Sequence, residues 1–192
     1  MKKYPENLSS VEVEKELGRE RYKNRYKRTI RSTFSVLIIA AALAVLVATL
    51  WMPVLQIYGA SMVPTLQEGE IVVSIKNNDF KPGDIVAFYY GNKLLVKRYI
   101  AGPGAWVDIK EDGTIFVDGE ELDEPYVVEK AFGSCDLEFP YQVPEEKYFL
   151  VGDQRATSVD SRHSSVGCVS EEQIVGKISF RIWPMAVFGK IE

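Results

Sequence analysis

An uncharged stretch, residues 32–67, constrains this chain more than any other feature of its sequence. Its most apolar part, residues 34–55, is 22 residues long and as a helix would span roughly 33 Å, against about 30 Å for the hydrocarbon core of a bilayer. Trp51 lies near one end of this part, as interfacial aromatic residues do, and Pro53 is expected to end the helix. The stretch therefore predicts one membrane-spanning helix.

The charges on the two sides of this stretch differ in sign. Residues 1–55 carry ten Lys/Arg and five Asp/Glu, whereas residues 56–192 carry thirteen and twenty-two. Seven of the basic residues lie shortly before the stretch: Arg19, Arg21, Lys23, Arg25, Lys27, Arg28 and Arg31. Basic residues favour the cytoplasmic side of a membrane helix, so we expect a partly helical or disordered cytoplasmic tail (1–31), an anchor (32–55) and an extracytoplasmic domain (56–192). An acidic domain also argues against binding of nucleic acid.

A cleaved signal peptide is the competing interpretation of the apolar stretch. Such peptides have an apolar region of about 7–15 residues, followed by small residues at the cleavage site. Here the apolar region is longer, and Trp51-Met52-Pro53-Val54-Leu55 follows it. The pattern favours an uncleaved, single-pass anchor.

The extracytoplasmic domain has the pattern of short strands separated by turns. Apolar or β-branched runs bounded by Gly, Pro, Asn and Asp occur at residues 71–75, 85–90, 94–100, 114–117, 147–151 and 177–182. Gly91-Asn92 is a hairpin signal, and Ile178, Phe180 and Ile182 alternate as one buried face would. Ser170 is a candidate cap of a short helical turn, and residues 123–147 form an irregular excursion. We predict a mainly β, largely antiparallel domain after one N-terminal transmembrane helix.

The first candidate for chemistry is the motif Gly59-Ala60-Ser61-Met62-Val63-Pro64-Thr65, just past the most apolar part of the stretch. A serine held between a flexible glycine and a stiff Pro-Thr turn is a candidate nucleophile. An ordinary loop serine has the same local pattern, so the motif alone does not decide between the two.

A nucleophilic serine needs a base, and the chain offers two types. His163, the single histidine, lies in a polar loop; a solvated loop histidine is the plainer interpretation, and a Ser-His-Asp triad stays open. Lys97 lies in an apolar run, and to act near pH 8 its pKa must fall by about 2–3 units, or roughly 3–4 kcal/mol, which burial can supply. The alternative for Lys97 is an outward lysine on an edge strand.

A third stretch, residues 152–162, is dense in acids, arginines and hydroxyl groups. Asp160 and Arg162 are able to pair and to hold the loop rigid, while Ser158 is able to bond to an amine. The alternative is a polar loop that faces solvent.

The chain has two cysteines, Cys135 and Cys168. A disulfide between them and two free thiols are equally compatible with the sequence. Neither cysteine has the spacing of a zinc site or of a redox pair.

Taken together these stretches resemble bacterial type I signal peptidases, which are membrane-anchored serine proteases with a Ser-Lys dyad. Four motifs occur in the order of that family: the Ser61 motif; Gly83-Asp84-Ile85-Val86; Val96-Lys97-Arg98 with Gly102-Pro103-Gly104; and Gly152-Asp153-Gln154-Arg155 through Ser158-Val159-Asp160-Ser161-Arg162. The resemblance covers the anchor and essentially the whole extracytoplasmic domain, which it identifies as the catalytic domain with a signal-peptidase-like fold.

The resemblance implies a role for each matching residue. Ser61 is the expected nucleophile and Lys97 the general base, while Ser158 orients the lysine amine. Asp160, Arg162, Asp153 and Arg155 brace the site; the backbone of Ser61 and Gly59 stabilises the oxyanion; and Met62 contacts substrate. The implied substrates are secretory pre-proteins, cut after small-x-small sites at the bacterial cell membrane, with the lipid bilayer as the other partner. No cofactor and no metal are expected.

Three positions depart from the family pattern. Gly59 replaces the hydroxyl residue that donates to the oxyanion in some members, so backbone groups or water must serve. Gln154 stands where Asn is usual and Ala105 where Asp is usual.

The alternatives to a signal peptidase are a self-cleaving repressor, a sortase and a tethered binding domain. The anchor and the 152–162 loop argue against a repressor, and the contexts of both cysteines argue against a sortase. The presence of both Ser61 and Lys97 argues against a binding domain.

Overall fold

The computed structural model describes residues 10–77 and 79–191 of the chain, with side chains from residue 14 onward. The chain divides into two units, Met1–Ala48 and Thr49–Glu192, each of which is described by itself. The first nine residues of the predicted cytoplasmic tail lie outside the described residues. The domain boundaries 1–31, 32–55 and 56–192 stay a prediction.

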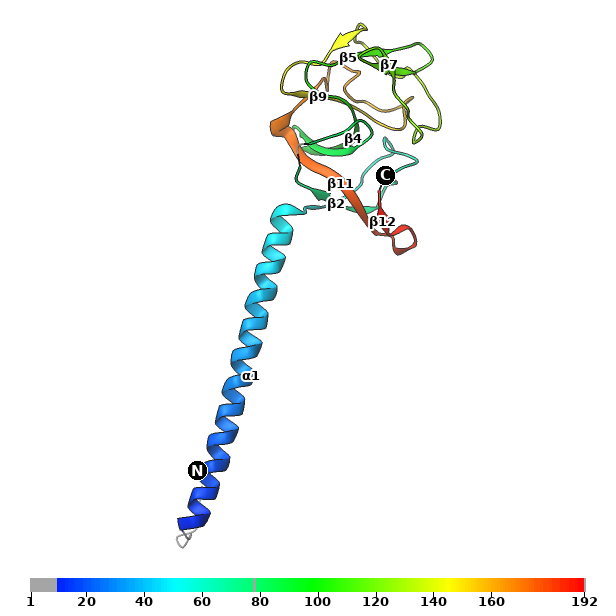
Figure 1. Cartoon of the computed structure of the whole chain (residues 1–192). Helices are drawn as coiled ribbons and strands as arrows, with labels where there is room; N and C mark the ends of the chain where they lie inside the picture. The colour runs from blue at the N-terminus through cyan, green and yellow to red at the C-terminus, as the bar shows by residue number, and fades with distance from the viewer. Residues whose placement is uncertain (1–9, 78, 192) are drawn as a thin grey trace. The chain divides into compact units, whose positions relative to one another are not determined.

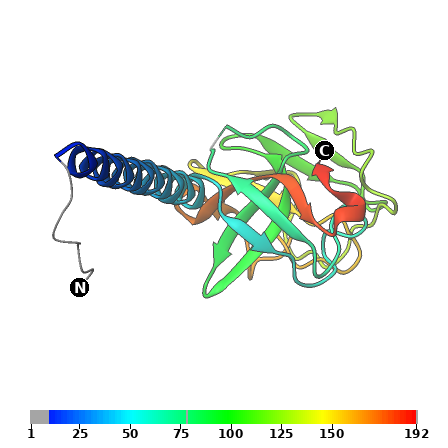
Figure 2. The same ribbon diagram turned by 90° about the horizontal axis from the view of Figure 1, so that it is seen from below.

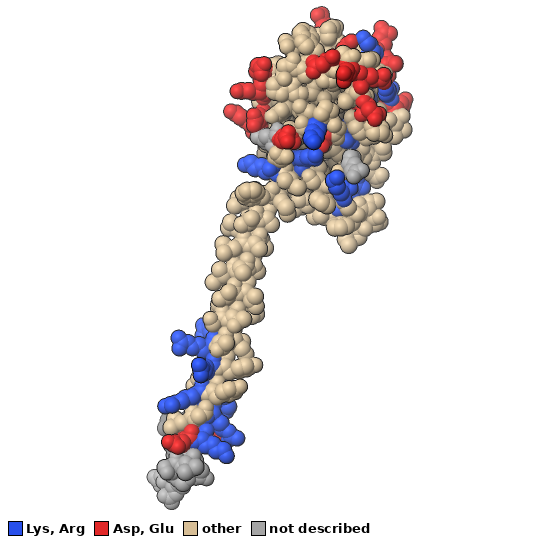
Figure 3. All heavy atoms as spheres, in the orientation of Figure 1, with Lys and Arg blue, Asp and Glu red and all other residues tan. Residues whose placement is uncertain are grey.

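The N-terminal element is one helix, α1 (Ser10–Trp51), which continues without a break from the basic segment into the apolar one (Figure 1). It ends two residues before Pro53, as predicted. Its part Glu14–Trp51 is long and apolar enough to cross a membrane, and no residue of the most apolar stretch of this part is buried by the protein. Figure 3 shows Lys and Arg gathered on the N-terminal part of α1 and uncharged side chains along the rest. An unburied apolar surface of this kind is typical of a helix in lipid rather than of a core helix.

The second unit consists of two antiparallel sheets (Figures 1 and 2). In the larger one, seven strands run in the order β1-β2-β11-β3-β4-β9-β10, and an eighth, β12, pairs with β11; the smaller has the order β7-β6-β5-β8. The strands are β1 (Val54–Gln56), β2 (Ile71–Ile75), β3 (Ile85–Tyr90), β4 (Lys93–Ala101), β5 (Trp106–Ile109), β6 (Ile115–Val117), β7 (Glu120–Glu121), β8 (Tyr141–Gln142), β9 (Lys147–Val151), β10 (Val169–Ser170), β11 (Ile174–Trp183) and β12 (Gly189–Lys190). Two short 3₁₀ helices accompany them, η1 (Glu171–Gln173) and η2 (Met185–Val187). The predicted fold class is confirmed.

Most local signals in the sequence have the predicted structure. Gly91 (φ 56°) and Asn92 join β3 to β4 as a two-residue hairpin, because glycine accepts the positive φ that such a turn needs. The strand β4 ends where Gly102 begins the next turn, and Ser170 caps η1. Val54 and Leu55, which end the apolar stretch, pair with β2 as part of β1 rather than extending α1.

One predicted alternation is wrong. Ile178 is 1% exposed, as expected for the buried face of β11, but Phe180 is 44% exposed. The register of β11 against β2 shifts between Ile178 and Phe180 and again between Arg181 and Trp183. A β-bulge inserts an extra residue, so the side chains beyond it no longer follow the period of two that the sequence suggests.

Three apolar clusters form the core of this unit. One lies under the segment between β1 and β2 and contains Met62, Leu66, Val72, Ile85 and Ile178. A second packs β3, β4 and β9 together through residues such as Phe88, Tyr99 and Leu150. The third joins the smaller sheet to the ends of β4 and β9. Since β4 lies between β3 and β9, it is an interior strand with core on both sides.

Candidate active site

Ser61 lies in the loop that joins β1 to β2. The ends of this loop are closed by two backbone bonds, from Ile57 N–H to Glu70 O at 2.8 Å and from Gly69 N–H to Ile57 O at 2.9 Å. Met62 and Leu66 are 2% and 0% exposed, and burial of such side chains stabilises by about 2 kcal/mol each. Ser61 itself is half-buried. The apolar neighbours therefore hold the loop against the core while the serine stays at its rim.

Lys97 is buried on the interior strand β4, at 4% exposure. Its Nζ donates a hydrogen bond to Ser158 Oγ at 2.9 Å. Burial lowers the pKa of Lys97 to about 8; the carboxylate of Asp160 opposes this shift and the guanidinium of Arg162 adds to it. The alternative of an edge-strand lysine facing solvent is wrong, since β3 and β9 pair with β4 on both sides.

The loop 152–162 follows β9 and is ordered by a buried ion pair. Arg162 donates to Asp160 through Nε at 2.8 Å and through Nη2 at 2.9 Å. Asp160 also accepts the N–H of Gly152 at 2.9 Å. Burial acts to raise the pKa of Asp160, but the hydrogen bonds and charge of Arg162 outweigh it and the pKa is lowered. The predicted pair is present, and the alternative of a solvated loop is wrong.

The serine loop and the 152–162 loop meet at Gly152. A Cβ at this position would clash with Ser158 Oγ and would lie 2.7 Å from the carbonyl oxygen of Ser61. The N–H of Gln154 donates to the same Ser61 carbonyl at 3.0 Å. Ser158 also accepts from Lys97, so the carbonyl of Ser61 and the amine of Lys97 each contact the 152–158 part of this loop.

Comparison with known proteins assigns the chain to a family. Residues 30–183 match the family described as signal peptidase, peptidase S26. The chain belongs to this signal peptidase family. It is 38% identical over 152 residues to signal peptidase IB of Staphylococcus aureus (strain COL), and the match covers 69% of this chain and 78% of that protein. It is 33% identical over 176 residues to signal peptidase I of Bacillus amyloliquefaciens, covering 86% and 94%.

A solved structure of a signal peptidase I from Enterococcus faecalis V583 is 27% identical, covers 52% of this chain and 97% of that chain, and has a TM-score of 0.45. As a member of the S26 family, the chain is a serine peptidase, a hydrolase that acts on peptide bonds. Together with the relatives, α1 indicates that this peptidase is anchored in a membrane.

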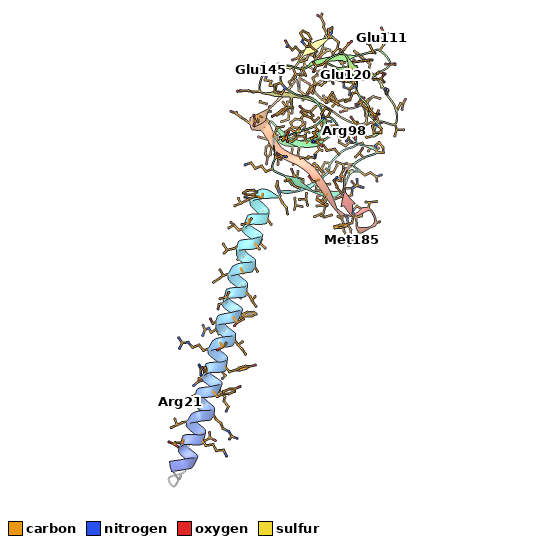
Figure 4. The ribbon with its side chains drawn as sticks, viewed as in Figure 1. Arg21, Arg98, Glu111, Glu120, Glu145 and Met185 are labelled. Carbon is orange, nitrogen blue, oxygen red and sulfur yellow. The ribbon has the colours of Figure 1, made fainter. Side chains whose placement is uncertain are left out.

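The signal peptidase motifs contain a second buried ion pair that sequence reasoning missed. Arg98, the neighbour of Lys97, donates to Asp153 through Nε at 2.8 Å and Nη2 at 2.6 Å. Thr65, in the serine loop, donates its hydroxyl to the same carboxylate at 2.5 Å, and Arg98 Nη1 donates to Gly83 O at 2.6 Å. Figure 4 shows Arg98 inside the β unit. An arginine within an apolar strand was the available signal, because a buried guanidinium needs a carboxylate.

Arg155 also has a partner that the sequence did not indicate. Its Nη1 donates to Glu124 Oε2 at 3.0 Å, and Nη2 contacts the other carboxylate oxygen. Glu124 lies in the segment 123–147, which its sequence predicts to be an irregular excursion. Nothing in the local pattern distinguishes it from its exposed acidic neighbours.

His163 is not part of the group around Lys97. Its Nδ1 lies 2.8 Å from Ser165 Oγ and 3.8 Å from Asp136 Oδ2. Both contacts use the same ring nitrogen, whereas a catalytic triad needs one partner on each nitrogen. The interpretation of His163 as a loop histidine agrees with these contacts.

The other residues that the sequence singled out are Met62, Gly59 and the two cysteines. Met62, the predicted substrate contact, is a core residue at 2% exposure, so that role stays a prediction. Gly59 has φ 78°, which a side chain rarely adopts. Cys135 and Cys168 are free and half-buried, and burial raises the pKa of the Cys168 thiol.

Proposed function

We propose that this signal peptidase is a membrane-bound serine endopeptidase that removes N-terminal signal peptides from exported pre-proteins after small-x-small sites, with Ser61 and Lys97 as its dyad. The observation that carries the proposal is the buried amine of Lys97, which donates to Ser158 and whose pKa falls to about 8. A neutral amine is a competent base, and an ordinary surface lysine is protonated at that pH. Membership of the S26 family and the named signal peptidases support the same conclusion.

Acylation begins when the neutral Lys97 amine accepts the proton of Ser61 Oγ. The oxygen attacks the carbonyl carbon of the scissile bond, and the backbone N–H groups of Ser61 and Gly59 stabilise the resulting oxyanion. As the C–N bond breaks, the Lys97 ammonium donates its proton to the leaving amine. The signal peptide is then held as an ester on Ser61, and Lys97 is neutral again.

Deacylation repeats these steps with water as the nucleophile. Lys97 accepts a proton from water, whose oxygen attacks the ester carbonyl, and then returns the proton to Ser61 Oγ as the ester bond breaks. The signal peptide leaves with a new carboxylate. Both half-reactions therefore use one base, and none of the steps needs a cofactor.

The bracing residues act through Lys97 and the serine loop. Ser158 accepts a hydrogen bond from the Lys97 amine and orients it, and the Asp160–Arg162 pair holds Ser158 in place. Asp153 joins Arg98, next to Lys97, to the hydroxyl of Thr65 in the serine loop. Arg155 extends the brace to Glu124, and Met62 is the proposed substrate contact beside Ser61.

The proposed location is the bacterial cell membrane, with the N-terminus in the cytoplasm and the catalytic domain outside. The basic residues before the apolar part of α1 support this orientation. The partners are the lipid bilayer and secretory pre-proteins, and the acidic second unit argues against nucleic acid.

The test is cleavage of a secretory precursor with an Ala-x-Ala site by the detergent-solubilised full chain. Ser61→Ala and Lys97→Ala should each lower kcat/KM by about a thousandfold or more, since each removes one half of a unit that acts together. Lys93→Ala, which removes an exposed lysine from the same strand, is the matched control and should be unaffected. The kcat/KM of the wild type should rise with pH to a plateau, with a midpoint near the Lys97 pKa of about 8.

Near-normal activity of folded Lys97→Ala would refute the dyad. No cleavage by the wild type, with a control peptidase cutting the same precursor, would favour a tethered binding domain. Circular dichroism and thermal unfolding of each variant separate loss of chemistry from loss of fold.

A further inference from the structure

Glu124 and Tyr126 lie in an irregular segment, yet each contacts a buried arginine. They lie in the tripeptide Glu124-Pro125-Tyr126, between β7 and β8, outside the four signal peptidase motifs. Glu124 is 7% exposed as a whole residue and 0% exposed in its side chain, although acidic side chains are almost never buried unless they are paired. Tyr126 is half-buried. Both side chains contact an arginine of the candidate active site.

Glu124 is the acidic partner of Arg155. The guanidinium faces both carboxylate oxygens of Glu124, with Nη1 to Oε2 at 3.0 Å, and both side chains are 1% exposed or less. Arg155 also donates through Nε to Gly152 O at 3.1 Å, and its own carbonyl accepts from Arg162 Nη2 at 2.9 Å. Glu124 therefore holds an arginine that ties together the two ends of the 152–162 loop.

Tyr126 covers the other buried arginine. Its ring centroid lies 3.6 Å from Cζ of Arg98, a cation–π contact, and Arg98 is the neighbour of Lys97 on β4. Its hydroxyl donates to Glu124 Oε1 at 3.2 Å, which links the two contacts. Burial raises the pKa of Tyr126, so the hydroxyl stays a neutral donor. One tripeptide thus contacts both the strand that carries Lys97 and the loop that carries Ser158.

We infer that Glu124 and Tyr126 are positioning residues that hold the 152–162 loop against β4 and so keep the Lys97 amine dry and aligned with Ser158. This inference rests on the proposed Ser61–Lys97 dyad. Neither residue reaches the reacting atoms. Their effect passes through Arg155 to the loop and through Arg98 to the strand.

The expected signature is a change in the pH dependence of the reaction. Burial is the largest cause of the lowered Lys97 pKa, and the charges that act on it belong to Asp160, Arg162 and Asp153. If the loop loosens and water reaches the amine, the pKa rises toward its ordinary value and the base is neutral only at higher pH. Loss of the negative charge of Glu124 would by itself move the pKa downward, so the sign of the shift separates the two effects.

The experiment measures kcat and KM of the full-length enzyme in detergent on an Ala-x-Ala precursor between about pH 6 and 10.5, a range that brackets the ordinary lysine pKa. Glu124→Gln keeps the shape of the side chain and removes its charge, while Tyr126→Leu removes the ring without changing any charge. Glu121→Gln is the matched control for charge, because Glu121 lies three residues away, is exposed and pairs with Lys130 instead. Tyr126→Phe is the conservative variant, which keeps the ring over Arg98.

We expect Glu124→Gln and Tyr126→Leu to lower kcat at pH 7 by about ten- to a hundredfold with KM little changed, as small misplacements of catalytic groups do. The lower limb of the pH profile should move upward by about one unit, so that part of the loss is recovered at high pH. Tyr126→Phe should restore most of the activity that Tyr126→Leu loses, and Glu121→Gln should match the wild type.

An unshifted or downward-shifted pH limb in both folded variants would overturn the inference, as would equal losses in Glu121→Gln. If Glu124→Gln does not fold, Tyr126→Leu decides alone. Lys97→Ala is measured in the same series. Activity retained by Lys97→Ala refutes the proposed function itself, whereas an inactive Lys97→Ala beside an unshifted Glu124→Gln refutes only the positioning role.

Discussion

Lys97 shows how one residue acquires its chemistry from its surroundings. Its side chain has the same structure as that of the exposed Lys93 at the start of β4, yet burial lowers its pKa to about 8. The folded state therefore disfavours the ammonium that the unfolded chain carries in water. Holding this amine ready as a base reduces the stability of the domain at neutral pH.

Replacement of Lys97 by methionine should reverse that loss. The pKa falls from 10.5 when unfolded to about 8 when folded, so below pH 8 the charge destabilises the native state by about 3 kcal/mol. Between pH 8 and 10.5 the unfolded chain binds more protons, and the free energy of unfolding of the wild type should rise with pH. Lys97→Met should be more stable than the wild type at pH 7, with the difference shrinking through this window.

The measurement is chemical unfolding of both proteins in detergent at several pH values, followed by tryptophan fluorescence. A wild type more stable than Lys97→Met at pH 7, or a difference that does not change with pH, would contradict the assigned burial of the ammonium.

At the scale of elements, interior strands and two ordered loops position the site. The strand β4 is held between β3 and β9, and the loop after β9 returns to it through Ser158. The serine loop is fixed to the same place through Gln154 and through the Asp153 carboxylate. Pairing with β3 and β9 restricts the backbone of β4 more than the local preferences of its residues would, because hydrogen bonds hold both edges of the strand.

The bulge in β11 leads to a prediction about two neighbouring apolar residues. Ile178→Ala should lower the free energy of unfolding by about 2–4 kcal/mol, as loss of a buried aliphatic side chain does. Phe180→Ala, although it removes a larger side chain, should cost less than about 1 kcal/mol, because Phe180 is 44% exposed. Urea unfolding of the two variants measures both values, and equal costs would mean that both side chains face the core.

At the scale of the whole molecule, the chain combines a long helix with a β unit of opposite charge. Residues 1–55 carry a net charge of +5 and residues 56–192 of −9, and Figure 3 shows the acidic side chains spread over the β unit. A basic flank on one side of an apolar helix favours one orientation in a membrane.

The proposed orientation is testable in protoplasts of a bacterium that expresses the chain with an N-terminal tag. Added protease should degrade residues 56–192 and leave the tag intact, because the basic flank of α1 is retained in the cytoplasm. After detergent lysis the tag should be degraded too, which controls for its intrinsic resistance. A tag cut in intact protoplasts, beside a protected β unit, would reverse the orientation.

The sequence by itself determined the features that depend on neighbouring residues. The uncharged stretch, the turn residues and the apolar runs predicted the helix, the hairpin at Gly91-Asn92 and the strands β2, β3, β4, β6, β9 and β11, because these patterns follow from local geometry. The Ser61 and Lys97 motifs were recognisable for the same reason. The alternation in β11 failed at a bulge, which no local pattern marked.

Only the tertiary structure decided which polar residues are buried and with whom they pair. Arg98 and Asp153 are 55 positions apart, and Glu124 and Arg155 are 31 apart. Desolvation and ion pairing depend on how the whole chain packs, and no window of neighbouring residues contains that information. For this reason Lys97 remained an open alternative in the sequence, and became a buried amine with a lowered pKa only in the fold.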